Sequence, residues 1–185
     1  MNKYVIFDRD GTLIEHIHYL KDPNLVKLKP GTAAGMQLLL INKYKFGIIT
    51  NQSIINRKIA TEKEVADTNN KVQDFCSDFR AKFDFIYHCP HTPEENCICR
   101  KPKIALGIQA ITKFKIDVEN SFYVGDQYSD VEFARNLGLN PILINQAKSG
   151  NFGEDKLEFS DIFEASLYIT NTNFSEIQNH RRNFE

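Results

Sequence analysis

The sequence has no long apolar run and almost no net charge. Hydrophobic residues make up 42% of the 185 residues, but no run approaches the roughly 20 apolar residues of a membrane span. The formal net charge is −1, which gives no general attraction to nucleic acids or anionic membranes. Residues 1–15, MNKYVIFDRDGTLIE, have too short an apolar stretch and too acidic an end for a signal peptide. We therefore expect a cytosolic protein without membrane or nucleic-acid partners.

Cysteines are also few, and three of the four lie close together. Cys89, Cys97 and Cys99 share an eleven-residue stretch with His91. Four such ligands at this spacing can close a tetrahedral zinc site. In a cytosolic chain of this length, such a cluster favours metal binding or free thiols over disulfides. The remaining Cys76 falls in a helical pattern, and we expect it to be a plain buried or half-buried thiol.

Short apolar segments alternate with helical patterns along most of the chain. The expected strands span residues 3–8, 45–50, 83–88, 121–125 and 141–145, and the expected helices span 32–44, 61–82, 103–115 and 129–137. This alternation predicts βαβ units and a parallel sheet covered on both faces. The length suits one domain, so we expect a single α/β, Rossmann-like domain of three layers at residues 1–170. Residues 171–185 read as a polar C-terminal tail.

Two carboxylates follow the first expected strand in the run Asp8-Arg9-Asp10-Gly11-Thr12. One of them could attack a phosphorus atom, while the other protonates the leaving oxygen and later takes a proton from water. A solvated turn is the alternative interpretation. A calcium loop is disfavoured because the further Asn/Asp and Glu ligands of an EF-hand are missing downstream.

Other polar side chains stand where later strands are expected to end, and in parallel sheets ligands bind at this edge. Thr50 and Asn51 offer a hydroxyl and an amide to a phosphate, although Thr-Asn is also a common cap or turn pair. Lys101 could neutralise that phosphate, or it could simply be solvated. Asp126 is placed to share a metal with the first strand's motif. Asp130 could orient Lys101 or a metal-bound water, and it could also cap the next helix.

Several carboxylates at one site repel each other, and a hard divalent cation would relieve that repulsion. Oxygen ligands favour Mg²⁺, which also bridges to phosphate. The sequence therefore predicts a magnesium-dependent phosphoryl-transfer site at the carboxyl edge of the sheet.

In this order the motifs resemble those of the haloacid dehalogenase superfamily of aspartyl-phosphate phosphatases, over about residues 3–146. The resemblance implies a nucleophile, a general acid/base, a phosphate-binding hydroxyl, a lysine and a magnesium ligand, matched in turn by Asp8, Asp10, Thr50, Lys101 and Asp126. It also implies that Asp8 and the backbone carbonyl of Asp10 bind the magnesium. The 40 positions from Asp10 to Thr50 read as a loop and one helix, which predicts a minimal cap and an open site.

The cysteine cluster continues into Arg100-Lys101-Pro102 and narrows the resemblance. The combined pattern is similar to two related phosphatase families, the D-glycero-D-manno-heptose 1,7-bisphosphate 7-phosphatases and the histidinol-phosphatases. In both, the resemblance implies a structural zinc with four protein ligands and no open position, here Cys89, His91, Cys97 and Cys99. Such a zinc would brace the loop that carries Lys101.

The segment Asn51-Gln52-Ser53 followed by Arg57 resembles the heptose phosphatases. Arg57 and Arg100 could bind the second, non-reacting phosphate of a bisphosphate, although Arg57 could also be a solvated cation. The chain departs from that family at Ile54, where the family has glycine, and at Gln127, where lysine is common.

We therefore expect a monomeric phosphatase acting on a small phosphorylated sugar, most simply heptose 1,7-bisphosphate at its 7-phosphate. A histidinol-phosphatase, or a non-catalytic binding module on the same scaffold, remain alternatives. A nucleic-acid 3′-phosphatase is disfavoured by the net charge and by the lack of a basic, aromatic groove. His16 and His18 follow the first motif, and the sequence leaves open whether they touch substrate.

Overall fold

A computed structural model describes residues 1–144 and 158–171 of the chain. Within these residues, six parallel strands form one sheet in the order β3-β2-β1-β4-β5-β6. The strands are β1 (Tyr4–Phe7), β2 (Lys45–Asn51), β3 (Phe83–Cys89), β4 (Phe122–Gly125), β5 (Asn140–Ile144) and β6 (Glu158–Phe159). The predicted parallel α/β fold is confirmed, with one strand more than expected.

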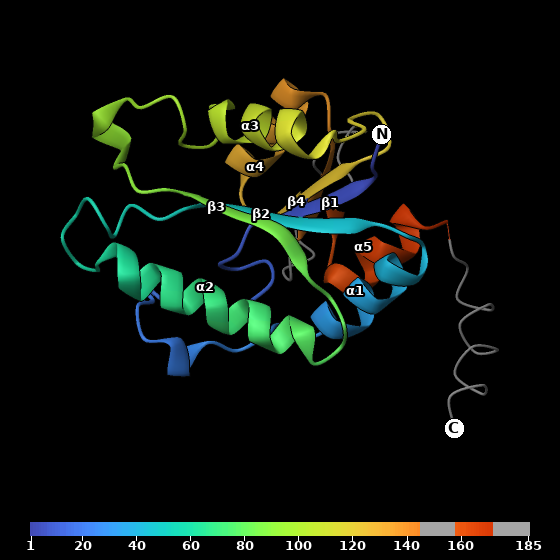
Figure 1. The fold of residues 1–185 in the computed structure, drawn as a ribbon, viewed down its shortest axis with the longest axis horizontal. Coiled ribbons are helices and arrows are strands. Elements are labelled where there is room, and N and C mark those ends of the chain that lie inside the picture. Colours follow the sequence, from blue (N-terminus) through green and yellow to red (C-terminus); the bar gives the residue numbers. More distant parts are fainter. Residues whose placement is uncertain (145–157, 172–185) are drawn as a thin grey trace.

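Five helices cover the sheet in the described part of the chain: α1 (Thr32–Ile41), α2 (Glu62–Ser77), α3 (Ala105–Phe114), α4 (Tyr128–Leu137) and α5 (Ile162–Ile169). Figure 1 shows α1, α2 and α5 on one face and α3 and α4 on the other, which gives the predicted three layers. Besides a short 3-10 helix at Pro23–Leu25, only α1 forms a helix between β1 and β2. No cap domain is inserted there, in agreement with the predicted minimal cap.

The central strand β1 supplies side chains to both layers of the core. Val5 and Phe7 pack into the cluster shared with α1, α2 and α5, whereas Tyr4 and Ile6 pack into the cluster shared with α3 and α4. Successive side chains of a strand point to opposite faces, and all four residues are at most 1% exposed. This burial on both faces holds the end of β1, and hence Asp8, in a fixed place.

Two expected helices are shorter than the sequence suggested. The pattern at 32–44 ends at Ile41 and that at 61–82 ends at Ser77. Shortly after each helix a residue adopts a positive φ, at Lys43 (φ 66°) and Arg80 (φ 66°). A residue in the left-handed conformation commonly follows the end of an α-helix. Neither position is a glycine, so the apolar spacing alone predicted both helices too long.

The start of α2 agrees with its sequence signal. The side chain of Thr61 accepts a hydrogen bond from the backbone N–H of Glu64 at 3.2 Å, and the Glu64 carboxylate accepts from the N–H of Thr61 at 2.7 Å. This is the capping box that the run from Thr61 to Glu64 predicts. The cap fixes where α2 begins, beside the turn that follows β2.

The last described elements, β6 and α5, were not predicted from the sequence. Helix α5 begins after Asp161, whose side chain accepts from the N–H of Glu164 at 2.9 Å, and it packs against α1. Of the predicted C-terminal tail at 171–185, all but Asn171 lies outside the described residues. In the described ranges, no helix is both long enough and apolar enough to cross a membrane.

Candidate active site

A pocket of about 450 Å³ lies beyond the carboxyl ends of β1, β2 and β4. Asp8 follows β1, Thr50 and Asn51 end β2, and Asp126 follows β4. The parallel register brings these strand ends together, since the backbone N–H of Asp8 donates to the carbonyl of Val124 at 2.8 Å. The lining includes eight of the predicted site residues: Asp8, Asp10, Thr50, Asn51, Arg100, Lys101, Asp126 and Asp130.

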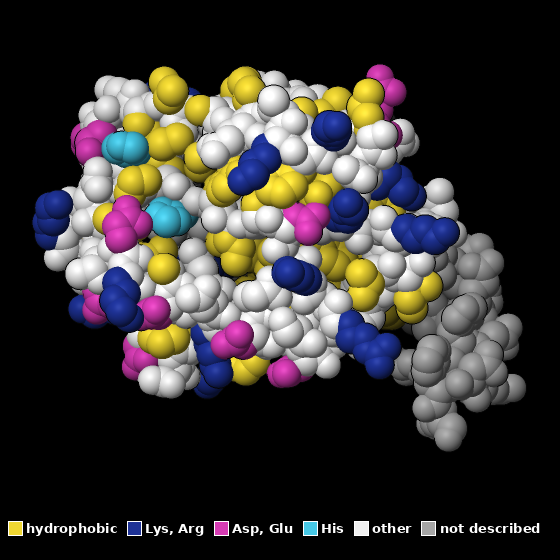
Figure 2. Space-filling view, viewed as in Figure 1, with side chains coloured by type: hydrophobic (Ala, Val, Ile, Leu, Met, Phe, Trp, Pro, Cys, Tyr) yellow, Lys and Arg dark blue, Asp and Glu magenta, His cyan; other side chains and the backbone are white. Residues whose placement is uncertain are grey.

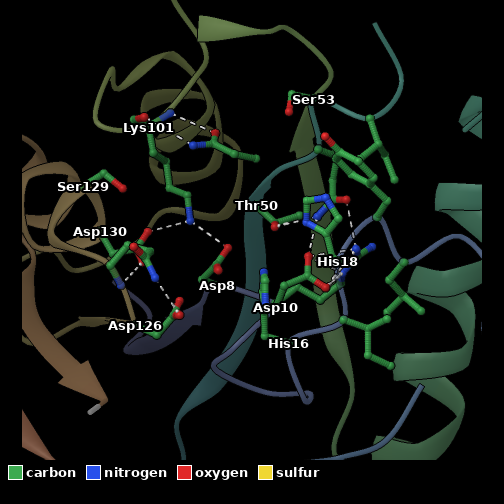
Figure 3. Close-up of a pocket in the computed structure, with 18 of the residues that line it drawn as sticks. Asp8, Asp10, His16, His18, Thr50, Ser53, Lys101, Asp126, Ser129 and Asp130 are labelled. Carbon is green, nitrogen blue, oxygen red and sulfur yellow. Dashed lines mark hydrogen bonds and ion pairs between the residues drawn. The ribbon is translucent and has the colours of Figure 1, made fainter. Parts of the chain in front are cut away.

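Lys101 is buried, and its ammonium group meets three acceptors, of which Figure 3 shows Asp8 and Asp130. Its Nζ lies 2.8 Å from Oδ1 of Asp8, 2.7 Å from Oδ1 of Asp130 and 2.6 Å from the hydroxyl of Tyr123. These acceptors match the three N–H donors of an ammonium group. Burial lowers the pKa of Lys101, but the negative groups around it outweigh burial and hold that pKa well above its usual value. Lys101 is therefore a fixed positive charge beside Asp8.

The carboxylates of Asp8, Asp126 and Asp130 form the acidic side of the pocket. One oxygen from each lies within 4.8 Å of the others. Oδ2 of Asp126 accepts from Gln127 at 2.9 Å, whereas Oδ1 is buried with no hydrogen-bond partner among the described residues. Burial raises the pKa of Asp126, and the charge of Asp8 adds to this against the hydrogen bond from Gln127. An all-oxygen donor set with one unpaired buried oxygen fits Mg²⁺.

Two glycines make room for this carboxylate cluster. A Cβ on Gly11 would lie 2.3 Å from Oδ2 of Asp126, and a Cβ on Gly125 would lie 2.3 Å from Oδ2 of Asp130. Gly11 also has a φ of +81°, a conformation that side-chain-bearing residues rarely adopt. The turn of the Asp-Arg-Asp-Gly-Thr motif therefore needs glycine both for its backbone and for the approach of Asp126.

Asp130 has two structural partners. Its Oδ2 accepts from the backbone N–H of Gln127 at 3.0 Å, which caps α4, while Oδ1 pairs with Lys101. Burial raises the pKa of Asp130 to about 6, against the opposing charge of Lys101. The two alternatives that the sequence left open, capping a helix and orienting Lys101, thus coexist in one carboxylate.

Asp10 is held separately from this cluster. In the view of Figure 3, Asp8 lies between Asp10 on one side and Asp126 and Asp130 on the other. The Asp10 carboxylate lies 2.9 Å from Nη2 of Arg9 and accepts from Nε2 of Gln52 at 2.7 Å. The two carboxylates of the motif therefore stand in different surroundings, one beside a lysine and one beside an arginine and an amide. Such a difference suits two different chemical roles.

The predicted zinc ligands converge in the loop that follows β3. The Sγ atoms of Cys89, Cys97 and Cys99 lie 3.2–3.6 Å apart, and Nδ1 of His91 lies 3.5 Å and 3.2 Å from Cys89 and Cys99. Tetrahedral zinc with Zn–S bonds of about 2.3 Å would place its sulfurs about 3.8 Å apart. Burial raises the pKa of Cys97, but N–H donors led by Arg100 outweigh it and lower the pKa to about 7. The donor set therefore fits a closed zinc site.

The outer wall of the pocket is formed by the loop after β1 and by residues flanking β2 and the cysteine loop. His16 and His18 both line the pocket, as do Ser53 and Arg100. The guanidinium of Arg100 also donates to the carbonyl of His91 at 3.3 Å, which ties this cation to the cysteine loop. Arg57 is exposed and is not among the lining residues, so its predicted contact with substrate stays a prediction without support from the pocket geometry.

Reasoning from the sequence missed several side chains that organise the site. Arg9 and Tyr123 are each 1% exposed, yet Arg9 contacts Asp10 and Tyr123 contacts Lys101. Asn69, from the middle of α2, binds Arg9 at 2.8 Å. Arginine is rarely buried, so nothing in the sequence indicated that Arg9 lies in the interior. Its position inside the first motif was the only signal of a role. The other two look like ordinary strand and helix residues.

The chain is similar in sequence and in fold to several known proteins. Residues 3–169 match the family model described as polynucleotide kinase 3 phosphatase. The histidine biosynthesis bifunctional protein HisB of Legionella pneumophila (strain Lens) is 36% identical over 148 residues, which cover 79% of this chain and 42% of that protein. The D-glycero-beta-D-manno-heptose-1,7-bisphosphate 7-phosphatase of Helicobacter pylori (strain J99) is 35% identical over 147 residues, covering 78% of this chain and 84% of the relative. The chain thus spans less than half of the HisB relative.

Among solved structures, a D,D-heptose 1,7-bisphosphate phosphatase from B. bronchiseptica, complexed with magnesium and phosphate, superimposes with a TM-score of 0.82. The alignment covers 92% of this chain and 99% of the other. Because the sequence identity is 23%, this similarity shows a shared fold and nothing about activity. The chain therefore shares the α/β fold of this solved phosphatase. The chain belongs to the polynucleotide kinase 3 phosphatase family, which it matches over most of its length. The resemblance predicted from the motifs is confirmed.

Proposed function

We propose that this chain is a magnesium-dependent phosphatase that removes the 7-phosphate of D-glycero-D-manno-heptose 1,7-bisphosphate through a phosphoryl group carried on Asp8. We further propose that it works as a cytosolic monomer without nucleic-acid or membrane partners. The carrying observation is the ion pair of 2.8 Å that fixes Asp8 beside Lys101, with Asp10 held apart by other partners.

In the first step, Asp8 is the nucleophile. Lys101 engages Oδ1, and among the described residues Oδ2 has no hydrogen-bond donor, so Oδ2 is the oxygen free to attack phosphorus. The new bond joins Oδ2 to phosphorus while the bond between phosphorus and the sugar oxygen breaks. Asp10 gives its proton to that leaving oxygen. The sugar departs as an alcohol and the phosphoryl group stays on Asp8.

In the second step, Asp10 acts as the base. It takes a proton from water as the water oxygen attacks phosphorus, and the bond from phosphorus to Asp8 breaks. Inorganic phosphate leaves, and Asp8 is a carboxylate again. Mg²⁺ held by Asp8, Asp126 and the backbone carbonyl of Asp10 would supply positive charge to the phosphoryl oxygens. Lys101 adds a fixed charge, and Thr50 offers a hydroxyl at the end of β2.

The zinc would act through the loop rather than in the reaction. Its four ligands leave no open position for a substrate. The last ligand, Cys99, stands two positions before Lys101, and Asn51 at the end of β2 accepts from the Lys101 N–H at 3.0 Å. We infer that the cysteine loop and β2 together hold Lys101 in its buried position.

The choice of a bisphosphate rests on Arg100 and on the relatives. Arg100 lines the pocket, and its guanidinium suits a second phosphate. The relatives include a probable D-glycero-D-manno-heptose-1,7-bisphosphate 7-phosphatase from Thermoplasma volcanium, of which the chain covers 94%, and the Helicobacter pylori enzyme, of which it covers 84%. Asn51 and, less directly, Arg57 remain proposed substrate contacts. His16 and His18 stand where the sugar would lie.

A histidinol-phosphatase is the second candidate, because HisB proteins are relatives at 36% identity. The amine of histidinol phosphate would need an anionic partner. The lining carboxylates are Asp8, Asp10, Asp126 and Asp130, all engaged at the reacting end. This distribution favours the bisphosphate.

The test is phosphate release by zinc-replete protein with magnesium, measured side by side on both anomers of heptose 1,7-bisphosphate and on histidinol phosphate. We expect a preference of about 100-fold in kcat/KM for the bisphosphate, about 2.7 kcal/mol of transition-state discrimination. A preference for histidinol phosphate would overturn the substrate assignment. If the protein turned over no phosphate monoester, it would not be a phosphatase. The non-catalytic binding module would then be the remaining interpretation. Asp8→Asn should abolish turnover while the protein still folds, because Asp130 continues to pair with Lys101.

A further inference from the structure

Arg9 is the largest side chain buried to less than 2% exposure in the described part of the chain. All three of its side-chain nitrogens are used: Nη1 donates to Asn69, Nε to Asp10, and Nη2 to both Asp10 and Gln52. A buried arginine is costly unless its donors are satisfied. These hydrogen bonds offset the free-energy cost of burying the guanidinium, and they link Arg9 to Asp10 and Gln52 in the pocket wall.

Arg9 determines which way the amide of Gln52 points. Arginine carries only donors, so Oε1 of Gln52, at 2.9 Å from Nη2, must be the atom that faces it. The amide nitrogen of Gln52 then faces the pocket. Asn69 in turn accepts from Nη1 at 2.8 Å and anchors the guanidinium to α2. The orientation of Gln52 thus follows from hydrogen-bond chemistry.

The two N–H groups of Gln52 are both used at the site. Nε2 donates to Oδ2 of Asp10 at 2.7 Å and to Oγ1 of Thr50 at 3.0 Å. Gln52 is 4% exposed, so water does not compete freely for these donors. One amide therefore links the predicted general acid/base to the predicted phosphate-binding hydroxyl.

The two oxygens of Asp10 are held unequally. Oδ2 accepts at 2.9 Å from Arg9 and at 2.7 Å from Gln52, whereas Oδ1 has only longer contacts of 3.2 and 3.3 Å, both to Arg9. A proton on Oδ2 would point at groups that can only donate. Oδ1 is thus the oxygen that can carry a proton toward a substrate.

Thr50 is oriented by the same amide. Because Oγ1 accepts from Gln52, the hydroxyl hydrogen of Thr50 must point elsewhere, and no described residue accepts it. Thr50 lines the pocket, so this hydrogen is available to a phosphoryl oxygen. A hydroxyl preset as a donor avoids reorganisation when phosphate binds.

We propose that Arg9 and Gln52 are positioning residues for the phosphatase reaction: they clamp Oδ2 of Asp10, leave Oδ1 to exchange the proton with the leaving group, and turn the Thr50 hydroxyl toward the phosphoryl group. This inference rests on the proposed function, and it assigns to two residues of the pocket wall roles that they exert through Asp10 and Thr50. Asn69 supports them by anchoring Arg9.

The test compares two esters of similar size that differ in their need for an acid. Phenyl phosphate has a poor leaving group that needs a proton, whereas p-nitrophenyl phosphate releases a stable anion. First-turnover release of phenol and of nitrophenolate is measured with magnesium for wild type and Gln52→Leu. We expect the variant to lose on the order of 10- to 100-fold for phenyl phosphate and several-fold at most for the nitrophenyl ester. Inhibition by inorganic phosphate should also weaken in the variant.

The matched control is Gln73→Leu in α2. Gln73 is a glutamine whose side chain donates to the carbonyl of Ala81 and accepts from the N–H of Phe83, away from the pocket. This control should leave the ratio of the two ester rates unchanged. Arg9→Lys is a second variant. It keeps the positive charge but loses the planar guanidinium that donates to Asp10 and Gln52 together, and it should show the same difference between the esters.

Each outcome decides the proposal. An equal loss for both esters in folded Gln52→Leu protein would mean that Gln52 is only structural, and the proposal would be wrong. If Arg9→Lys fails to fold, Gln52→Leu still decides, because Gln52 carries no charge whose burial must be balanced. A wild type that releases neither product with magnesium would overturn the proposed function itself, which distinguishes the two failures.

Discussion

Lys101 and Asp8 form an ion pair of 2.8 Å although they stand 93 positions apart in the sequence. The side chains are only 3% and 10% exposed. Removing one partner of a buried pair leaves an uncompensated charge, at a cost of about 3–5 kcal/mol. We predict that Lys101→Met lowers the free energy of unfolding by about this amount in magnesium-free buffer. It should also reduce kcat by about 10²–10³-fold, the loss expected when a charge that stabilises the transition state is removed.

The matched control is Lys103→Met, because Lys103 is exposed two positions further on. Its stability should change by no more than about 0.5 kcal/mol. Chemical denaturation and steady-state kinetics measure both quantities. Wild-type kcat in Lys101→Met would show that Lys101 is not part of the reacting site.

Tyr123 connects Lys101 to the end of β2. Its hydroxyl accepts from Lys101 and donates to the carbonyl of Ile49, both at 2.6 Å. Tyr123→Phe leaves a buried donor and a buried acceptor unpaired, so we predict a loss of about 1–3 kcal/mol in denaturant unfolding. Tyr87→Phe is the control, since the Tyr87 hydroxyl is buried without a partner among the described residues. Equal effects of the two substitutions would contradict this role of the Tyr123 hydroxyl.

We predict that the zinc ligands of the cysteine loop contribute to the stability of the protein and not to the reaction itself. Cys97→Ser removes one of four ligands, so the variant should lose zinc and melt at a lower temperature. Cys76→Ala also removes a cysteine, but Cys76 is buried against Met36, away from the cluster, and this variant should keep its zinc. Metal analysis and thermal melts provide the measurement. Full zinc content with normal melting in Cys97→Ser would count against a structural zinc at this loop.

The capping box of α2 gives a prediction about stability alone. Thr61→Ala removes a side chain that accepts from the N–H of Glu64, and it should cost about 1 kcal/mol. Lys63→Ala removes the exposed ion pair between Lys63 and Asp67, and it should cost at most about 0.5 kcal/mol. Thermal unfolding compares the two, and kcat should be unchanged in both. A cost for Thr61→Ala no larger than for Lys63→Ala would contradict the cap.

The sequence predicted which polar groups meet because topology brings them together. Asp8, Thr50 and Asp126 each follow or end a strand, and parallel strands end at one edge of a sheet. The order of strands and helices was therefore enough to place the pocket. The zinc ligands could also be foreseen, since they lie within one short loop.

The residues that sequence analysis missed depend on long-range packing. Besides its neighbour Asp10, the acceptors of buried Arg9 come from Asn69 of α2 and Gln52 beside β2. No local sequence pattern encodes these two long-range contacts. Arg57 shows the opposite case. Ile54 and Ile55 turn inward and pack near Val65, and Arg57 in the same turn is left exposed. Local similarity to a family segment could not reveal which way that turn faces.

The central claim is that Asp8 carries the phosphoryl group, and chemical trapping tests it most directly. Protein mixed with magnesium and p-nitrophenyl phosphate is quenched in acid, reduced with borohydride and digested for mass spectrometry. Reduction converts an aspartyl phosphate to homoserine, which distinguishes Asp8 from Asp10 in the same peptide. We predict homoserine at position 8 in the wild type and more of it in Asp10→Asn, where the second step is slowed. Product formation without homoserine at position 8, or with homoserine at another residue, would contradict the account.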